Sequence, residues 1–309
     1  MLSRVAERLY WAARYLERAE NTARLVSVYD NLLYDLPAGM VEISWFNLIS
    51  LNSSAEEFTK RYKVQNERNV VKFLLQDEKH LGSLSASVRY VRENFRTSRD
   101  VIPPSAWEQI NELNIYVSKN AKTALARNGR HDFLSEVIER SQSLNGLLTG
   151  TLMRDEAWEF IMLGRFIERA DMTTRILDAG AAVLENSEAF AHSNPAQVIW
   201  GNVLRSQGAY MSYRRAIKSI VRGSDVAEFL LYDTHIPRSV TFCSDQINQA
   251  ATKLAQDSGK KQPPKMKLPR FEIEKEEDLG ADFRNYLNDL QLSIGETHNH
   301  ICNTWFARD

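Results

Sequence analysis

The chain has 309 residues, of which 43% are hydrophobic and 26% charged, which is ordinary for a soluble globular protein with a substantial core. Its 39 Lys and Arg residues balance 40 Asp and Glu residues, so charge gives no reason to expect binding to nucleic acid or to a membrane surface. The two cysteines, Cys243 and Cys302, exclude a disulfide scaffold and favour a cytoplasmic location. No stretch approaches the roughly 18 uncharged apolar residues of a membrane span.

Helical periodicity dominates the chain. Glycine and proline are sparse, and apolar residues recur at i, i+3, i+4 and i+7 through long windows, beginning with residues 3–34. Ser54 with Glu57 and Ser105 with Glu108 match capping boxes that would open two further helices. Other helices are expected at 67–99 with a break near Gly82, and at 131–149, 153–185, 195–222, 224–232, 238–257 and 278–306. The polar, proline-rich residues 258–276 are typical of a long exposed connection. The sequence therefore predicts an all-α fold, a single helical bundle over 1–309.

Two segments resemble each other at a fixed offset of 151 residues. The identical pairs are Arg14/Arg165, Glu17/Glu168, Arg18/Arg169, Ala19/Ala170, Thr22/Thr173 and Arg24/Arg175, and Glu20/Asp171 is chemically alike. Charged helices often look similar, but here the identities are concentrated in the charges. We therefore expect an internal duplication, or a pseudo-symmetric pair of helices around a shared centre, with the repeat covering about 8–30 and 156–181.

The second copy of this motif should be buried. Apolar residues lie on every side of its helix, namely Ile161, Met162, Leu163, Ile167, Ala170, Met172, Ile176 and Leu177. Buried Arg and Glu need partners, because desolvation costs several kcal/mol per ion. Its charges should therefore pair with each other or face a pocket for a charged ligand. The local options are Glu168 with Arg165, Glu168 with Arg175, and Asp171 with Arg175.

A third charged segment lies between the two copies. The charged residues of this segment recur at spacings of three or four along one side of a helix: Arg89, Arg92, Glu93, Arg96 and Arg99. Downstream stand Trp107, Asn111, Arg205, Tyr213, Arg214, Arg215 and Pro237-Arg238-Ser239. These residues either form solvated surfaces or converge with the motif charges on an internal groove. Arginine suits such a groove because its planar guanidinium binds carboxylate or phosphate bidentately.

The segment Leu9-Tyr-Trp-Ala-Ala-Arg-Tyr-Leu-Glu-Arg-Ala-Glu-Asn-Thr-Ala-Arg24 closely resembles the N-terminal signature of the bacterial alpha-E family. Arg92–Arg96, Trp107 with Asn111, and Gly164–Asp171 are similar to its other shared blocks, so the resemblance covers essentially the whole chain. It implies a helical protein of unestablished role. It also implies an association with a circularly permuted ATP-grasp protein, often beside a transglutaminase-like peptidase. That setting suggests synthesis or turnover of a peptide or isopeptide bond by an amidoligase system.

Two functions remain open. In the first, the chain is a helical accessory partner of the ATP-grasp amidoligase and its buried charges are structural, with binding of an anionic peptide or amino acid open within this role. In the second it is an enzyme or a substrate-binding subunit, in which Glu17 or Glu168, with a raised pKa, acts as general acid or base. The candidate substrate-binding residues are Arg14, Arg18, Glu20, Arg24, Arg92, Glu93, Arg96, Arg165, Arg169, Asp171, Arg175, Tyr213 and Arg214. A solvent-reachable cavity lined by both motif copies would favour the second function, and charges sealed against each other the first.

Other chemistries find less support in the sequence. Neither Glu17 nor Glu168 has a histidine three residues on, as a di-iron bundle requires. His298 and His300 could hold a metal, but they lack a clear carboxylate partner and are expected to be exposed. The sequence predicts no metal site and no cofactor, and it is compatible with a homodimer.

Overall fold

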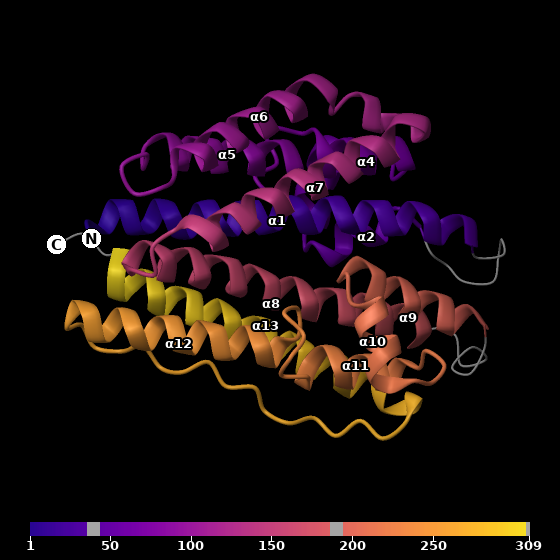
Figure 1. The fold of residues 1–309 in the computed structure, drawn as a ribbon. Helices are drawn as coiled ribbons and strands as arrows, with labels where there is room; N and C mark the ends of the chain where they lie inside the picture. Colours follow the sequence, from indigo (N-terminus) through magenta and orange to yellow (C-terminus); the bar gives the residue numbers. More distant parts are fainter. Residues whose placement is uncertain (36–43, 186–193, 307–309) are drawn as a thin grey trace.

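The computed structural model describes residues 1–35, 44–185 and 194–306, and every regular element in these ranges is helical (Figure 1). The all-α prediction is confirmed. The helices are α1 Ser3–Asp35, α2 Asn47–Leu51, α3 Ala55–Arg61, α4 Glu67–Leu75, α5 Leu84–Arg96, α6 Pro104–Asn120, α7 Arg127–Thr151, α8 Glu156–Glu185, α9 Asn194–Ser206, α10 Tyr210–Ile217, α11 Gly223–Tyr232, α12 Val240–Ser258 and α13 Ala281–Ile301. Short 3₁₀ turns cover Thr123–Leu125 and Glu276–Leu279, and a π-helical turn covers Cys302–Phe306.

The two helices that carry the repeated motif form the centre of the molecule. α1 and α8 lie side by side along its length, with α4–α7 on one side of the pair and α12 and α13 on the other (Figure 1). They run parallel, because contacts between them join residues at a nearly constant sequence separation, 154 for Arg14 and Glu168 and 152 for Glu17 and Arg169. One continuous hydrophobic core extends from Ala6 to Phe306 around this pair.

Gly164 sets the close approach of the two central helices. A Cβ atom at this position would lie 2.1 Å from the carbonyl oxygen of Tyr10 and 3.1 Å from the Cβ of Ala13. Backbone therefore packs directly on backbone here, which only glycine permits. Ala13 is the residue that corresponds to Gly164 in the first motif copy, so small residues from both copies meet at the contact.

The positions of the helices were predicted more accurately than the residues that cap them. Asn66, Ser83 and Ser239 are the side chains that cap α4, α5 and α12. The two predicted capping boxes are wrong. The hydroxyl of Ser54 donates to the carbonyl of Asn52, and Ser105 lies within α6, which begins directly after Pro103.

Two irregular segments differ from expectation. The helix predicted over 195–222 is interrupted between α9 and α10, where Gly208 adopts a left-handed conformation with φ of 62°. The connection 260–275 is irregular as predicted, but it is fastened to α12 rather than simply exposed. Asn248 binds both the N–H and the carbonyl of Met266, at 2.9 and 3.0 Å, and the Met266 side chain is buried.

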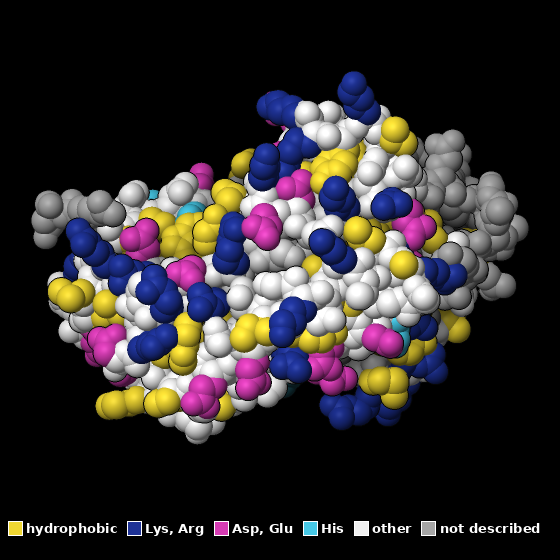
Figure 2. Space-filling view, turned by 90° about the horizontal axis from the view of Figure 1, so that it is seen from above, with side chains coloured by type: hydrophobic (Ala, Val, Ile, Leu, Met, Phe, Trp, Pro, Cys, Tyr) yellow, Lys and Arg dark blue, Asp and Glu magenta, His cyan; other side chains and the backbone are white. Residues whose placement is uncertain are grey.

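The surface carries both signs of charge. Basic and acidic side chains are interspersed on the face seen from above (Figure 2), in keeping with the formal charge of -1. None of the described helices combines the length and the apolar character needed to cross a bilayer.

Candidate functional site

The glutamates of the two motif copies are bound by arginines across the α1–α8 contact. Glu168 accepts hydrogen bonds from Nε of Arg14 at 2.9 Å and from Nε and Nη2 of Arg18 at 2.5 and 2.9 Å. Glu17 accepts bonds from Nε and Nη2 of Arg169, both at 2.8 Å, and lies 3.0 Å from Nη1 of Arg238. Glu17 is 1% and Glu168 3% exposed, so both carboxylates are sealed inside the protein. The predicted burial of Glu168 with an arginine partner is confirmed.

These ion pairs decide the protonation of both glutamates. Burial alone would raise the pKa of Glu17, but Arg169 and Arg238 outweigh burial and hold that pKa at about 2. Burial opposes Arg18 and Arg14 in the same way at Glu168, whose pKa is again about 2. The expectation of a glutamate with a raised pKa is therefore wrong. With all carboxylate oxygens engaged by guanidinium groups, neither residue is placed to exchange a proton with a ligand.

The next pair of charges in each copy is also arranged alike. Glu20 accepts from Arg24, and Asp171 accepts from Arg175, each at 2.9 Å across one helical turn. The predicted Asp171–Arg175 pair is confirmed. The alternative pairs of Glu168 with residues of its own helix are wrong, because that carboxylate turns to α1 instead. A pseudo-symmetric pair of helices is thus present, while a common ancestry of the two copies stays a prediction.

The symmetry breaks at Arg165. Its counterpart Arg14 binds Glu168, but Nη2 of Arg165 donates to the amide oxygen of Asn145 at 2.7 Å. By this symmetry Arg165 would bind Glu17, but Arg238 is the residue that lies beside Glu17 instead. Arg165 is 8% exposed, and burial together with the nearby Arg169 lowers its pKa to about 10. Among the described residues, this buried cation has an amide partner in place of a carboxylate.

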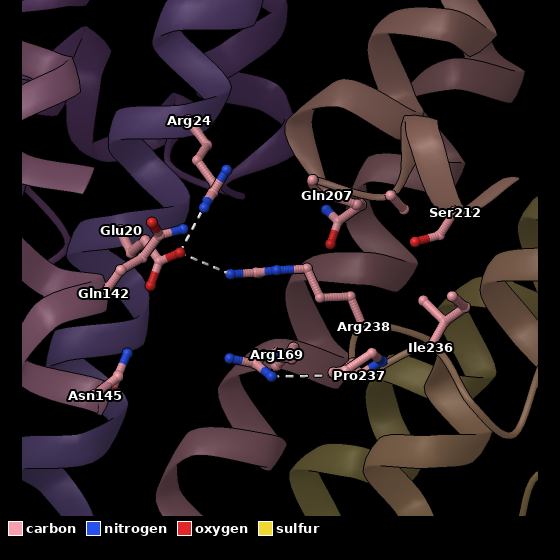
Figure 3. A pocket seen from close by; sticks show the side chains of 12 residues that line it. Glu20, Arg24, Gln142, Asn145, Arg169, Gln207, Ser212, Ile236, Pro237 and Arg238 are labelled. Carbon is pink, nitrogen blue, oxygen red and sulfur yellow. Dashed lines mark hydrogen bonds and ion pairs between the residues drawn. The ribbon is translucent and has the colours of Figure 1, made fainter. Parts of the chain in front are cut away.

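An open cavity of about 320 Å³ lies beside these charges. Residues from α1, α7, α8, the α9–α10 junction, α10 and the segment before α12 surround it (Figure 3). They are Glu20, Arg24, Gln142, Asn145, Arg169, Gln207, Gly208, Ala209, Ser212, Ile236, Pro237 and Arg238. Both motif copies contribute to the lining, through Glu20 and Arg24 from the first and Arg169 from the second. The chain therefore combines glutamates that are sealed by ion pairs with a solvent-reachable cavity that both motif copies line.

Several polar groups of the cavity are left for a ligand. Oε1 of Glu20 accepts from Arg24 and from Arg238, at 2.9 and 3.1 Å, whereas its Oε2 has no hydrogen bond among the described residues (Figure 3). Gln207 is 3% exposed, and its amide nitrogen has no partner in the described part of the chain. A buried polar group without a partner costs roughly 1–3 kcal/mol, so such a donor beside a cavity indicates a site for an acceptor.

Positive charge is in excess around this space. The guanidinium groups of Arg24, Arg169 and Arg238 line the cavity, and Arg165 is bonded to the lining residue Asn145. Among the described residues, two neighbouring carboxylates, Glu17 and Glu20, oppose these four cations in the ion pairs around the cavity. A ligand with net negative charge would balance the site.

The structure does not bring the third charged segment to this cavity. Arg92 donates to Asn111 at 2.9 Å and to Glu93 at 2.6 Å, and Arg96 binds Glu93 at 2.9 Å, all on the surface of α5 and α6. The guanidinium of Arg92 also lies over the ring of Trp107. These residues form a local, solvated network, because helical spacing placed them together on the outer side of α5.

The predicted residues of α10 also lie outside the cavity. Tyr213 is buried, and its hydroxyl donates to the carbonyl of Ile220 at 3.4 Å, where it helps to hold the loop after α10. Arg214 is exposed and reaches the carbonyl of Ser219. Ser212, on the same helix, lines the cavity in their place.

Sequence reasoning missed several lining residues of the site, among them Gln142 and Asn145 on α7. Arg238 stood among the downstream charges but was not chosen as a site residue, although it binds Glu17, Glu20 and the amide oxygen of Asn21. A lone arginine after a proline carries no spacing signal that could have selected it. Gln207 and Gly208 lie at the helix break that the sequence did not predict, and nothing in their local pattern marks them.

His298 is not the exposed terminal residue that we expected. Its Nδ1 lies 2.6 Å from the hydroxyl of Tyr10, and its ring is stacked on the Tyr10 ring. Burial and the nearby Arg14 lower the pKa of His298 to about 4, so the imidazole is neutral at pH 7. In the part of the chain that the structure describes, no three His, Cys, Asp or Glu side chains are grouped as a metal would require.

Comparison with known proteins places the chain in a family. Residues 1–306 match Alpha-E, described as a predicted alpha-helical domain with a conserved ER motif, and the chain belongs to this family. Several Glu-Arg pairs occur in the sequence. Glu17-Arg18 and Glu168-Arg169 are the two in which both residues take part in the ion pairs between α1 and α8.

Its relatives are themselves uncharacterized. The chain is 23% identical over 304 residues to uncharacterized proteins of Mycobacterium bovis and Mycobacterium tuberculosis. The match covers 90% of this chain and 34% of each relative, so the chain spans about a third of their length. No solved structure matches the chain.

Proposed function

We propose that this chain is a ligand-binding helical subunit, which holds an anionic ligand in the cavity and presents it to an ATP-grasp protein that forms the amide bond. The observation that carries the proposal is the cavity itself. It is open, is lined by Arg24, Arg169 and Arg238, and has a buried amide donor of Gln207 without a partner. Arginine binds carboxylates and phosphates through short, charge-assisted hydrogen bonds, which is the chemistry that an anionic ligand needs.

The state of the two central glutamates supports binding over catalysis. Glu17 and Glu168 are ionised, with their oxygens engaged by arginines, and Glu17 positions the guanidinium groups of Arg169 and Arg238 at the cavity. The sequence offers no nucleotide-binding loop, so activation of a carboxylate by ATP would come from another protein. The ATP-grasp partner, and a transglutaminase-like peptidase beside it, rest on the resemblance to the alpha-E family.

A pair of matched variants tests the binding site. Arg24 and Arg175 occupy equivalent places in the two motif copies and make equivalent ion pairs, but only Arg24 lines the cavity. We expect calorimetric titration with glutarate, L-glutamate and inorganic phosphate to detect binding of at least one of them. Arg24→Gln should weaken that binding roughly 10- to 100-fold, as expected for loss of a charge-assisted hydrogen bond. Arg175→Gln should leave it unchanged. Equal effects of both variants, or no binding of any of the three, would contradict the proposal.

A separate experiment tests the partner. The chain should co-purify with an ATP-grasp protein from the same genome when the two are co-expressed, and it should show little ATP turnover alone. Mass spectrometry of the mixture should reveal a product that needs ATP and both proteins. Failure to associate at micromolar concentration, with the activity of the ATP-grasp protein unchanged by this chain, would refute the partnership.

A further inference from the structure

We propose that the ligand of the cavity is a free amino acid with two carboxylates, such as L-glutamate, whose α-ammonium group is bound by Glu20. The inference rests on the proposed function and specifies its substrate class. Three properties of the cavity support it: its excess of positive charge, an acceptor oxygen among the arginines, and its size.

The excess of positive charge calls for a ligand with more than one anionic group. Four guanidinium groups, from Arg24, Arg165, Arg169 and Arg238, are opposed in their ion pairs by the two carboxylates of Glu17 and Glu20. The unpaired amide nitrogen of Gln207 adds a neutral donor. Two carboxylates would accept hydrogen bonds from these groups, and with its ammonium group the ligand would carry a net charge of -1 that offsets part of the excess, whereas an amino acid with a single carboxylate has no net charge to offset it.

Glu20 distinguishes an amino acid from a plain anion. Glu20 lines the cavity (Figure 3); its Oε1 is engaged by two arginines, but its Oε2 has no hydrogen bond among the described residues. An anion without an amine would place its own negatively charged oxygens next to the Glu20 carboxylate, and these like charges would repel each other. An ammonium group is a pure donor and fits the same position. The cavity therefore has acceptors and donors for both ends of an α-amino acid.

The volume limits the ligand to a small molecule. At about 320 Å³ the cavity is at the lower end of the range of small-molecule sites, which suits one amino acid better than a nucleotide. Ala209, Ile236 and Pro237 supply an apolar part of the wall, against which methylene groups of the side chain can pack.

The test compares two ligands that differ in the amine, in two matched variants. Calorimetric titration should show that L-glutamate binds more tightly than glutarate, which has both carboxylates but no amine. Glu20→Gln should weaken L-glutamate about 10-fold or more, as expected for loss of a charged partner, and should not weaken glutarate. Asp171→Asn is the control, because Asp171 is the counterpart of Glu20 and lies outside the cavity lining. It should leave both ligands unchanged.

The possible outcomes separate this inference from the proposed function. If glutarate or inorganic phosphate binds as tightly as L-glutamate to the wild-type chain, the amino-acid inference is wrong while the anion site stands. If none of these ligands binds, the proposed function itself fails. Circular dichroism and thermal unfolding establish whether Glu20→Gln folds. If it does not fold, the comparison of L-glutamate with glutarate in the wild-type chain still decides the inference.

Discussion

Glu17 and Glu168 exchange partners across the central helix pair: each carboxylate is bound by the arginine that directly follows the other in the sequence. Because α1 and α8 run parallel, a rotation about an axis along the helices carries one ion pair onto the other. The contact at Gly164 brings the helices close enough for these short bonds. The exchange holds Arg169 against Glu17, and Arg169 lines the cavity, so the core and the site share this ion pair.

The buried pairs should contribute far more to stability than a similar pair on the surface. Glu168→Ala leaves Arg14 and Arg18, whose side chains are only 12% and 23% exposed, without their carboxylate, and we expect a loss of about 3–5 kcal/mol in the free energy of unfolding. Glu93→Ala is the matched control, because Glu93 also binds two arginines, Arg92 and Arg96, but its side chain is 43% exposed. It should cost less than about 1 kcal/mol. Urea unfolding followed by circular dichroism measures both. Equal, small losses would show that the central pairs behave as a solvated network.

Acid should remove this stabilisation over a defined range of pH. The folded pKa of Glu168 is about 2, below its ordinary value of 4.5, so the folded state favours the ionised form. Its contribution is therefore complete above pH 4.5 and is lost as the pH falls from there toward 2. We expect the difference in unfolding free energy between the wild type and Glu168→Gln to be constant from pH 7 to 5 and to shrink below pH 4.5. A difference that stays constant down to pH 3 would contradict the assignment.

Replacement of Gly164 and of Gly146 by alanine should change the stability of the protein in opposite directions. Gly164→Ala would place a methyl group 2.1 Å from the Tyr10 carbonyl oxygen, so the helices must separate, and we expect a loss of about 1–3 kcal/mol. Gly146→Ala, on the open side of α7, meets nothing within 4 Å and should gain roughly 0.5–1 kcal/mol from helix propensity. Thermal unfolding of the two variants checks both signs. A neutral Gly164→Ala would mean that the backbone contact does not limit the approach of α1 and α8.

His298 should titrate well below an ordinary histidine. Burial and Arg14 lower its pKa from 6.5 to about 4, and the neutral ring is paired with the Tyr10 hydroxyl. Because the unfolded chain takes up this proton first, stability should begin to fall below pH 6.5 and continue to fall toward pH 4. An NMR titration of the ring resonances, assigned with His298→Gln, measures the pKa directly. A midpoint near 6.5 would show that the ring is solvated.

The sequence predicted the helices and the burial of the motif, since both follow from local periodicity. A helix that is apolar on every side has to be buried, and its charges then need partners. The identity of those partners could not be predicted, because it depends on how two distant helices are placed. The contact at Gly164 sets Glu168 against Arg14 and Arg18, where spacing along the chain had suggested Arg165 or Arg175.

The cavity was harder to predict for the same reason. Gln207 and Gly208 reach it because α9 ends at Ser206 and the chain turns through the left-handed Gly208, and Arg238 reaches it from a segment that precedes α12. Neither position has a periodic pattern. The charges of α5 show the converse: Arg92, Glu93 and Arg96 have regular helical spacing, yet it places them on a solvated surface.

A crystal structure of the chain grown with saturating L-glutamate would test the anion-binding cavity most directly. We expect the ligand to lie among the lining residues, with carboxylate oxygens within hydrogen-bond distance of the guanidinium groups of Arg24 and Arg238 and its ammonium group beside Oε2 of Glu20. A cavity that holds only water under these conditions, or a ligand bound elsewhere on the surface, would contradict the assignment.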